Sequence, residues 1–401
     1  MSHYAIVGAS LAGLAAADAL REEGFDGTIT VIDGAAELPS DRPPLSKQVL
    51  AGTMDPAAAH QPVAPRLPEL DLDLRLGTRA VALSAADKSI ELSDGSTLRP
   101  DGIVLATGGS PRRLPTDLDG VHVLRTLDDC LAIKADFDAS PQRVVVIGAG
   151  FIGAEVAATA RSLGLDVTMI EAQDRPMQRV LPGEIGDFVT DLHRGHGVDV
   201  RLGVGLDGFL GGTGTGARVA GVRLVDGTEV LADVVVVGIG VTPSVDWLDG
   251  SGLELDNGIV CDETCLAAPD IVAAGDVASW LNLAYGEQMR VEQWENAIEQ
   301  GRHVGRRLLA GGAVAEPFTP IPWFWTDQYD RKIQLAGRVG PGDDVAIVDG
   351  SVDDQRFVAL FRRGDRCVGV LGVNRPRHVV QTRMKMADGG LSWSDALAAF
   401  A

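Results

Sequence analysis

The sequence predicts an α/β protein with two similar nucleotide-binding domains and a third, α+β domain. Three observations support this prediction. A glycine-rich loop occurs twice, at residues 8–13 and 148–153. Hairpin signals and buried-strand patterns then recur in the same order after each loop. Beyond about residue 317 the sequence changes to clustered aromatic residues and alternating strand patterns.

Each glycine-rich loop lies between a predicted strand and a predicted helix. Apolar runs at residues 4–7 and 144–147 precede the loops, and alanine-rich stretches at 14–20 and 154–163 follow them. This order forms the phosphate-binding unit of Rossmann-like domains, where the amino terminus of the helix faces the anion. One such motif is a weak signal, whereas two copies in matching context predict two dinucleotide sites.

An acidic residue ends the second strand of each unit. Asp33 follows an apolar run at 29–32, and Glu171 follows one at 167–170. A carboxylate at this place accepts hydrogen bonds from ribose hydroxyl groups. With these acids, the predicted loop contacts to the dinucleotides are Gly8, Ser10 and Gly13 in the first unit, and Gly148, Gly150, Ile152 and Gly153 in the second.

The two halves of the chain continue in parallel after these units. Asp94-Gly95 and Asp226-Gly227 each split a pair of strand-like runs, as hairpin turns do. A buried strand that ends in glycine follows in each half, at 103–108 and 235–240. The ends of these strands add three residues to the predicted cofactor contacts: Ala106, Gly108 and Gly240.

A third such strand, at residues 271–276, has no counterpart in the second half. We therefore expect the chain to return to the first domain, with the second domain inserted in it. The predicted boundaries are 1–110 and 238–316 for the two parts of the first domain, 111–237 for the second domain and 317–401 for the third.

Residues 317–401 predict an antiparallel sheet with helices. Aromatic side chains cluster between 318 and 329, and alternating runs follow at 332–336, 345–348, 357–361 and 367–373. Helical patterns at 377–386 and 392–399 close the chain. The glycine-rich run at 211–216 is not followed by a helix, so it predicts a hairpin tip and not a third phosphate loop.

Composition excludes several classes of function. The chain of 401 residues carries 35 basic and 56 acidic side chains, and this excess argues against a nucleic-acid or anionic-membrane partner. It has no apolar run of transmembrane length, and its first strand begins so close to Met1 that we expect no signal peptide. Four scattered cysteines predict no disulfide framework, which fits a cytoplasmic protein.

Cysteine and histidine positions argue against thiol and metal chemistry. No cysteine precedes Cys130, so the helix after the first glycine-rich loop lacks the redox cysteine pair that disulfide reductases carry there. Cys261 and Cys265 have no further ligands nearby in sequence, and the seven histidines form no spaced cluster. The sequence therefore predicts no metal site.

Four segments carry a resemblance to a known family: residues 42–47, 124–129, 274–277 and 322–328. With the two loops, they make the chain similar over essentially its whole length to flavin-dependent NADH:ferredoxin reductases. This family includes putidaredoxin, rubredoxin and biphenyl-dioxygenase reductases, which serve bacterial cytochromes P450 and ring-hydroxylating dioxygenases.

The resemblance implies a glutathione-reductase-like fold, with FAD as bound cofactor and NADH as electron donor. The flavin contacts that it implies are Ala12, Asp33, Arg42, Lys47, Val81, Arg125, Asp276 and Trp294, with Trp323 marking the flavin edge. Chemistry supports several of them, since arginines suit phosphate groups and Trp294 offers an aromatic plane or an indole N–H.

Lys47 and Glu155 are the predicted catalytic residues. In related flavoproteins a lysine of the first domain pairs with the glutamate two residues after the second loop. A lysine near the flavin stabilises the negative charge that arrives with hydride, and Glu155 can hold that lysine. The alternative is an exposed lysine and a glutamate favoured by the dipole of the helix in its first turn.

We therefore predict an FAD-containing oxidoreductase that takes hydride from NADH and passes single electrons to a [2Fe-2S] ferredoxin. Two alternatives stay open: an NADH oxidase or quinone reductase, and a redox sensor resembling apoptosis-inducing factor. The ferredoxin is expected to dock near the C-terminal domain and the adjoining helix at 302–307. The basic residues expected there are Arg302, Arg306, Arg307, Arg331, Lys332, Arg338 and Arg375.

Overall fold

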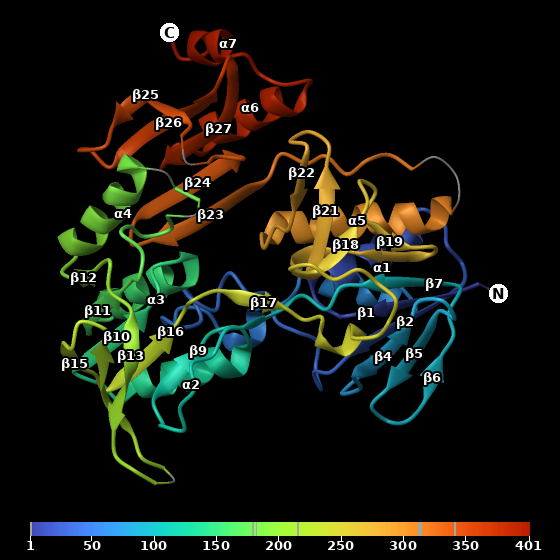
Figure 1. Ribbon diagram of the computed structural model, residues 1–401, viewed down its shortest axis with the longest axis horizontal. Coiled ribbons are helices and arrows are strands. Elements are labelled where there is room, and N and C mark those ends of the chain that lie inside the picture. Colours follow the sequence, from blue (N-terminus) through green and yellow to red (C-terminus); the bar gives the residue numbers. More distant parts are fainter. Residues whose placement is uncertain (1, 179, 182, 215, 312–314, 341) are drawn as a thin grey trace. The chain divides into compact units, whose positions relative to one another are not determined.

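The computed structural model describes residues 2–178, 180–181, 183–214, 216–311, 315–340 and 342–401, and the chain forms two compact units (Figure 1). Unit 1 comprises Met1–Asp41, His60–Ser110 and Thr242–Pro322, and unit 2 comprises Arg42–Ala59, Pro111–Val241 and Trp323–Ala401. Two short strands, β8 (Gly109–Pro111) and β17 (Val241–Pro243), lie where the chain passes between the units.

Unit 1 is built on a six-stranded sheet whose central strands are parallel. In spatial order its strands are β19 (Leu266–Ala268), β20 (Ile271–Ala273), β7 (Gly102–Leu105), β1 (His3–Val7), β2 (Thr28–Asp33) and β3 (Leu72–Leu76). Its apolar runs are buried on both faces, as in other parallel sheets. Because β20 pairs in parallel with β7, the chain does return to the first sheet, as the sequence predicts.

Helices α1 (Leu11–Glu22) and α5 (Trp294–Ala310) pack against each other in unit 1 (Figure 1). Two glycines of α5 permit an unusually close approach. A Cβ atom at Gly301 would lie 2.3 Å from the carbonyl oxygen of Ala12, and one at Gly305 would lie 2.8 Å from that of Ala16. Small residues on both helices therefore bring α5 directly onto the first turns of α1.

Two small sheets complete unit 1. The first is the antiparallel hairpin layer of β4 (Ala80–Ser84), β5 (Ser89–Leu92) and β6 (Thr97–Leu98). The second contains β18 (Ile259–Cys261), β21 (Ala278–Asn282) and β22 (Glu287–Met289). The predicted turn at Asp94-Gly95 joins β5 to β6, as expected.

Unit 2 contains a second parallel sheet. Its spatial order is β12 (Asp199–Arg201), β11 (Asp166–Ile170), β10 (Arg143–Ile147), β16 (Val234–Val237) and β9 (Val121–Val123). Helix α3 (Phe151–Ser162) follows β10 directly. Unit 2 also contains an antiparallel layer of β13 (Leu206–Gly211), β14 (Val219–Leu224) and β15 (Glu229–Leu231). Thr215, in the predicted hairpin tip, lies outside the described residues.

Two helices of unit 2 were not predicted. Helix α2 (Leu127–Asp138) begins with a capping box, in which Thr126 and Asp129 each bond the other's backbone N–H. Helix α4 (Glu184–Gly195) packs its apolar side against the C-terminal sheet, where the rings of Phe188 and Phe357 meet edge to face at 5.5 Å.

The C-terminal region is the predicted antiparallel α+β structure. Its sheet has the order β23 (Trp323–Gln328), β24 (Arg331–Gly337), β27 (Arg366–Val373), β26 (Arg356–Arg363) and β25 (Asp344–Ser351). Helices α6 (Pro376–Ala387) and α7 (Trp393–Ala398) follow it. The predicted fold class is thereby confirmed.

Residues 42–59 pack into unit 2, although they precede most of unit 1 in the sequence. Leu45, Val49 and Leu50 are buried in one core with Cys130 and Ile133 of α2. The boundaries of the cofactor-binding domains, in contrast, remain a prediction.

Candidate cofactor sites

The first glycine-rich loop forms a tight cradle before α1. Gly8 has a φ of 112°, which favours glycine, and a Cβ atom there would lie 2.2 Å from the carbonyl oxygen of Ala106. A Cβ atom at Gly13 would lie 1.9 Å from the carbonyl oxygen of Gly8. Ser10 is the N-cap residue of α1, so the loop presents the unpaired N–H groups of the helix amino terminus.

Asp33 braces this loop from the end of β2. Its Oδ2 accepts a hydrogen bond from the backbone N–H of Ala9 at 2.7 Å, and its Oδ1 accepts one from Ala35 at 2.8 Å. The predicted ribose-binding acid therefore lies against the phosphate loop, where a dinucleotide places its ribose.

The second loop repeats this construction in unit 2. A Cβ atom at Gly148 would lie 2.5 Å from the carbonyl oxygen of Gly238, and Gly150 is the N-cap residue of α3. Glu171 accepts hydrogen bonds from the backbone N–H groups of Ala149 at 2.7 Å and Gln173 at 2.9 Å. Two cradles of the same design are thus present, one in each unit.

Other predicted contacts of the second site surround this loop. A Cβ atom at Gly153 would lie 1.9 Å from the carbonyl oxygen of Gly148. Ile152 is exposed in the first turn of α3, and Gly240 has a φ of 100° just after β16. Two arginines that follow Glu171 in the sequence, Arg175 and Arg179, are not among the predicted contacts, but a free cation here would attract a phosphate group. Arg175 donates its Nε–H to Asp187 of α4 at 2.8 Å, and Arg179 lies outside the described residues.

In unit 1, the remaining predicted flavin contacts lie after two strands of the large sheet, on β4 and at the start of α5. Asp276 is buried in a single helical turn directly after β20. Trp294 begins α5 and donates its indole N–H to Asp41 at 2.8 Å. Val81 is exposed on β4, and Gly108, with a φ of 67°, follows β7.

Four predicted flavin contacts lie in unit 2 instead: Arg42, Lys47, Arg125 and Trp323. Arg125 precedes α2 and donates its backbone N–H to Asp129 at 3.0 Å. Trp323 opens β23, 5.7 Å from the ring of Trp325, and the guanidinium of Arg383 lies 5.5 Å from its centroid.

Lys47 and Glu155 form an ion pair within unit 2. The Lys47 ammonium lies 2.8 Å from Oε2 of Glu155, and their side chains are only 13% and 5% exposed. Although 108 residues separate them, they meet because residues 42–59 pack onto α3 and its neighbours. The structure therefore brings together the two predicted catalytic residues.

The Glu155 carboxylate receives three further hydrogen bonds. Ser46 donates to Oε2 at 2.5 Å, while Thr326 and the backbone N–H of Asp327 donate to Oε1 at 2.8 and 3.3 Å. We did not predict Ser46 and Thr326 as site residues. Both lie inside segments that carry the family resemblance, at 42–47 and 322–328, and this was the available signal.

The four thiols are unsuited to redox chemistry. All are free and buried, and burial raises the pKa of Cys130 to about 11 and that of Cys261 to about 12. Burial also raises the pKa of the Cys265 and Cys367 thiols. A nucleophilic thiolate is therefore disfavoured at each cysteine.

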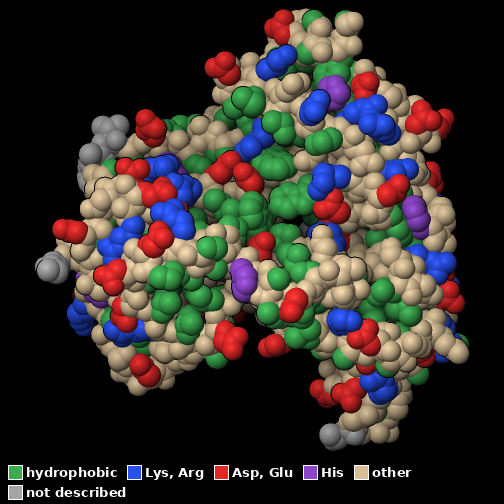
Figure 2. Space-filling view, turned by 180° about the vertical axis from the view of Figure 1, so that it is seen from behind, with side chains coloured by type: hydrophobic (Ala, Val, Ile, Leu, Met, Phe, Trp, Pro, Cys, Tyr) green, Lys and Arg blue, Asp and Glu red, His purple; other side chains and the backbone are tan. Residues whose placement is uncertain are grey.

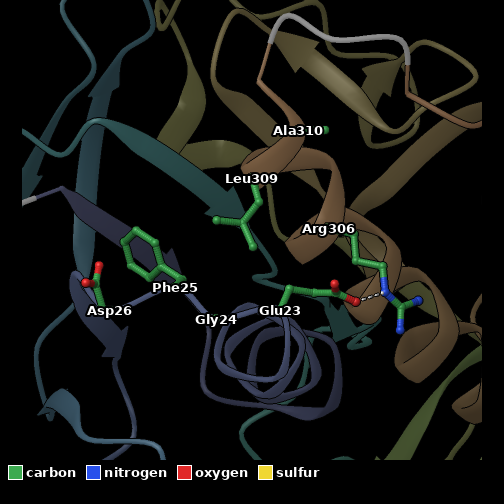
Figure 3. Close-up of a pocket in the computed structure, with 7 residues that line it drawn as sticks. All are labelled: Glu23, Gly24, Phe25, Asp26, Arg306, Leu309 and Ala310. Atoms are coloured by element: carbon green, nitrogen blue, oxygen red, sulfur yellow. Dashed lines mark hydrogen bonds and ion pairs between the residues drawn. The ribbon is translucent and has the colours of Figure 1, made fainter.

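One cavity of about 530 Å³ lies at the carboxyl end of α1 in unit 1. Figure 3 shows the lining residues, with the Arg306 guanidinium turned toward Glu23 in an ion pair of 2.9 Å. The cavity is lined by Glu23, Gly24, Phe25, Asp26, Arg306, Leu309 and Ala310. The phosphate loop lies at the other end of the same helix, so this cavity is separate from the candidate cofactor site.

Within the described ranges, no helix is long and apolar enough to span a lipid bilayer. The described residues also contain no group of three or more His, Cys, Asp or Glu side chains that could hold a metal ion.

Comparisons with known proteins agree over nearly the whole chain. Residues 2–301 match the family described as pyridine nucleotide-disulphide oxidoreductase, and residues 323–399 match the reductase C-terminal family. Rhodocoxin reductase of Rhodococcus erythropolis is 39% identical, covering 95% of this chain and 88% of that protein. The ferredoxin–NAD⁺ reductase component of the anthranilate 1,2-dioxygenase system of Burkholderia cepacia is 37% identical, covering 97% and 95%.

A solved structure shows the same similarity in three dimensions. The chain matches the reductase of the covalent putidaredoxin reductase–putidaredoxin complex with a TM-score of 0.90 and 35% identity, covering 96% of this chain and 93% of that one.

Proposed function

The chain belongs to the pyridine nucleotide-disulphide oxidoreductase family, and from this membership we propose that it is an FAD-containing NADH:ferredoxin reductase. It takes hydride from NADH and passes single electrons to a [2Fe-2S] ferredoxin, which feeds a cytochrome P450 or a ring-hydroxylating dioxygenase. The observation that carries this proposal is the pair of dinucleotide cradles, in a chain whose buried thiols disfavour disulfide chemistry.

FAD fits the cradle of unit 1. Gly8 and Gly13 leave room where a Cβ atom would collide with backbone, so the chain can approach a pyrophosphate closely. The amino terminus of α1 favours the anion, and Asp33 is oriented toward the ribose by its bonds to the loop. When bound, FAD supplies the two-electron to one-electron conversion that the reaction requires.

NADH is assigned to the cradle of unit 2, because Glu171 repeats the role of Asp33 there. A carboxylate accepts from both ribose hydroxyls of NADH but repels the 2′-phosphate of NADPH. Arg175, which could otherwise attract that phosphate, is engaged by Asp187 at 2.8 Å.

Lys47 and Glu155 are proposed to act at the flavin. Lys47 stabilises the negative charge that accompanies hydride transfer, and Glu155 holds the lysine in place through a buried ion pair. The Glu155 carboxylate is itself held by Ser46 and Thr326.

Ferredoxin is proposed to dock near the C-terminal domain. Residues 326–401 carry 11 basic and 10 acidic side chains, whereas the whole chain carries 35 basic and 56 acidic ones. This region is therefore nearly neutral, and it repels an acidic ferredoxin less than the rest of the chain does. Figure 2 shows acidic and basic side chains interspersed on the visible face. Several arginines of the predicted docking set form ion pairs within their own unit, as Arg302 does with Asp18 at 2.9 Å, so their charge is partly neutralised.

The cytoplasm is proposed as its location, since the four cysteines are free and buried and form no disulfide.

The test is NADH-driven reduction of the host's [2Fe-2S] ferredoxins by the purified flavoprotein, coupled to cytochrome c. We expect cytochrome c reduction to depend on added ferredoxin. Rapid NADH oxidation that ferredoxin does not change would identify an oxidase or quinone reductase instead. Slow turnover with every ferredoxin and a stable long-wavelength absorption band would identify a redox sensor.

A further inference from the structure

Behind Glu155, unit 2 contains a continuous series of buried polar side chains. On the inward face of β23, Thr326 and Gln328 are fully buried, at positions that apolar residues usually occupy. His193 of α4 is fully buried as well and lies against Gln328. From the surface to the Lys47 ion pair, the members of this polar chain are Tyr329, His193, Gln328, Thr326 and Glu155.

The hydrogen bonds of the polar chain all run in one direction. The amide nitrogen of Gln328 donates to Oγ1 of Thr326 at 3.3 Å, so the Thr326 hydroxyl is free to donate to Oε1 of Glu155 at 2.8 Å. The amide oxygen of Gln328 faces Nε2 of His193 at 3.0 Å, and because an amide oxygen only accepts, Nε2 must carry a proton.

The remaining link follows from the charge of the imidazole. Burial lowers the pKa of His193 to about 4, so the ring is neutral at pH 7 and its Nδ1 carries no proton. Nδ1 therefore accepts from the hydroxyl of Tyr329 at 3.0 Å. Every donor in the polar chain points toward Glu155.

Tyr329 occupies its position at a conformational cost. It has a φ of 57° in the two-residue turn between β23 and β24, in the left-handed region that favours glycine. Its ring stacks on His196 with centroids 3.6 Å apart, which holds the hydroxyl against His193. A two-residue hairpin turn requires a positive φ, so tyrosine is a less favoured residue here than glycine or asparagine.

We propose that the polar chain is a positioning device for the Lys47–Glu155 pair. Hydrogen bonds aligned in one direction polarise one another, and their effect accumulates on the final acceptor. Thr326 therefore fixes the Glu155 carboxylate through Oε1, which leaves Oε2 to hold the Lys47 ammonium. Thr326 and Gln328 are positioning residues, since they act through Glu155.

This inference rests on the proposed role of Lys47 and Glu155 in flavin reduction, and its first test needs neither flavin nor NADH. Two-bond ¹H–¹⁵N spectra of the imidazoles, with His193→Asn to assign the signal, report the tautomer of His193. We expect a neutral ring protonated on Nε2 at pH 7. A ring protonated on Nδ1, or an imidazolium, would break the direction of the chain and overturn the proposal.

The second test is anaerobic stopped-flow reduction of the FAD-loaded protein by NADH. We expect Thr326→Val to lower the limiting rate on the order of 10-fold, since one hydrogen bond to a charged group is lost, and Thr326→Ser to restore it. Thr190→Val is the matched control, because Thr190 is also buried but its hydroxyl bonds to Gly186 of its own helix, α4. This control should reduce at the wild-type rate.

A double variant tests the connection between members. Gln328→Leu alone should slow flavin reduction less than Thr326→Val, and it should add nothing to Thr326→Val, since the valine already disconnects Gln328 from Glu155. Independent, multiplying losses would show two separate packing defects and refute the chain. If NADH does not reduce the wild-type flavin, the proposed function fails, while the tautomer of His193 still tests the chain.

Discussion

Replacing Gly301 by alanine tests whether the packing of α5 on α1 holds the first phosphate loop in place. The new Cβ atom would lie 2.3 Å from the carbonyl oxygen of Ala12, whereas ordinary contact begins near 3.4 Å. The helices must therefore separate by about 1 Å. Because the atom in the way belongs to the backbone, the overpacking cost lies in the upper part of the usual range, at about 2–3 kcal/mol. Alanine recovers about 1 kcal/mol in helix propensity, so a net loss of about 1–2 kcal/mol is expected.

Part of this strain falls on the cofactor site. Ala12 belongs to the first turn of α1, directly after the loop that starts at Gly8. If the full loss of about 1–2 kcal/mol reduces the free energy of FAD binding, the affinity for FAD falls about 5- to 30-fold. Thermal unfolding of the apoprotein gives the stability change, and titration of apoprotein with FAD gives the affinity.

Gly195→Ala is the matched control for this experiment. Gly195 ends α4, and a Cβ atom there would have no neighbour within 4 Å. This variant should bind FAD as the wild type does and be at least as stable. If Gly301→Ala keeps wild-type stability and FAD affinity, or if both variants lose the same amount, the close-packing argument is wrong.

Four further predictions concern the cofactors and the partner. Lys47→Met should slow flavin reduction by NADH on the order of 10- to 1000-fold while FAD occupancy is kept, and wild-type stopped-flow rates would leave the ion pair structural. The kcat/KM for NADH should exceed that for NADPH, and Glu171→Gln should bring the two values closer together. Equal values in the wild type would contradict the assignment of NADH to the cradle of unit 2. Acid or heat should release FAD, because we see no motif for a covalent flavin link; FMN, or flavin retained by the precipitate, would disprove this. Ferredoxin reduction should fall steeply as the salt concentration rises, and more steeply than ferricyanide reduction, whereas equal salt sensitivity of the two reactions would place the docking face elsewhere. Lys332→Glu should raise the KM for ferredoxin.

The sequence alone was sufficient for features that depend on neighbouring residues. A glycine turn between a strand and a helix is a local pattern, so both loops and the acids Asp33 and Glu171 could be found directly. Hairpin turns such as Asp94-Gly95 and the alternating strands of the C-terminal region are equally local. The family resemblance added the pairing of Lys47 with Glu155, which the pattern of residues alone does not contain.

Only the tertiary structure decided which distant residues meet. Helices α2 and α4 were missed, and with α4 the contribution of His193 to the polar chain was missed as well. Ser46 and Thr326 are small hydroxyl residues with no sequence signature of their own. They became site residues because residues 42–59, α3 and β23 fold together around one carboxylate, Glu155. Local propensity determines which elements form. The partners of a buried charge depend instead on which polar groups the folded chain brings within hydrogen-bond distance.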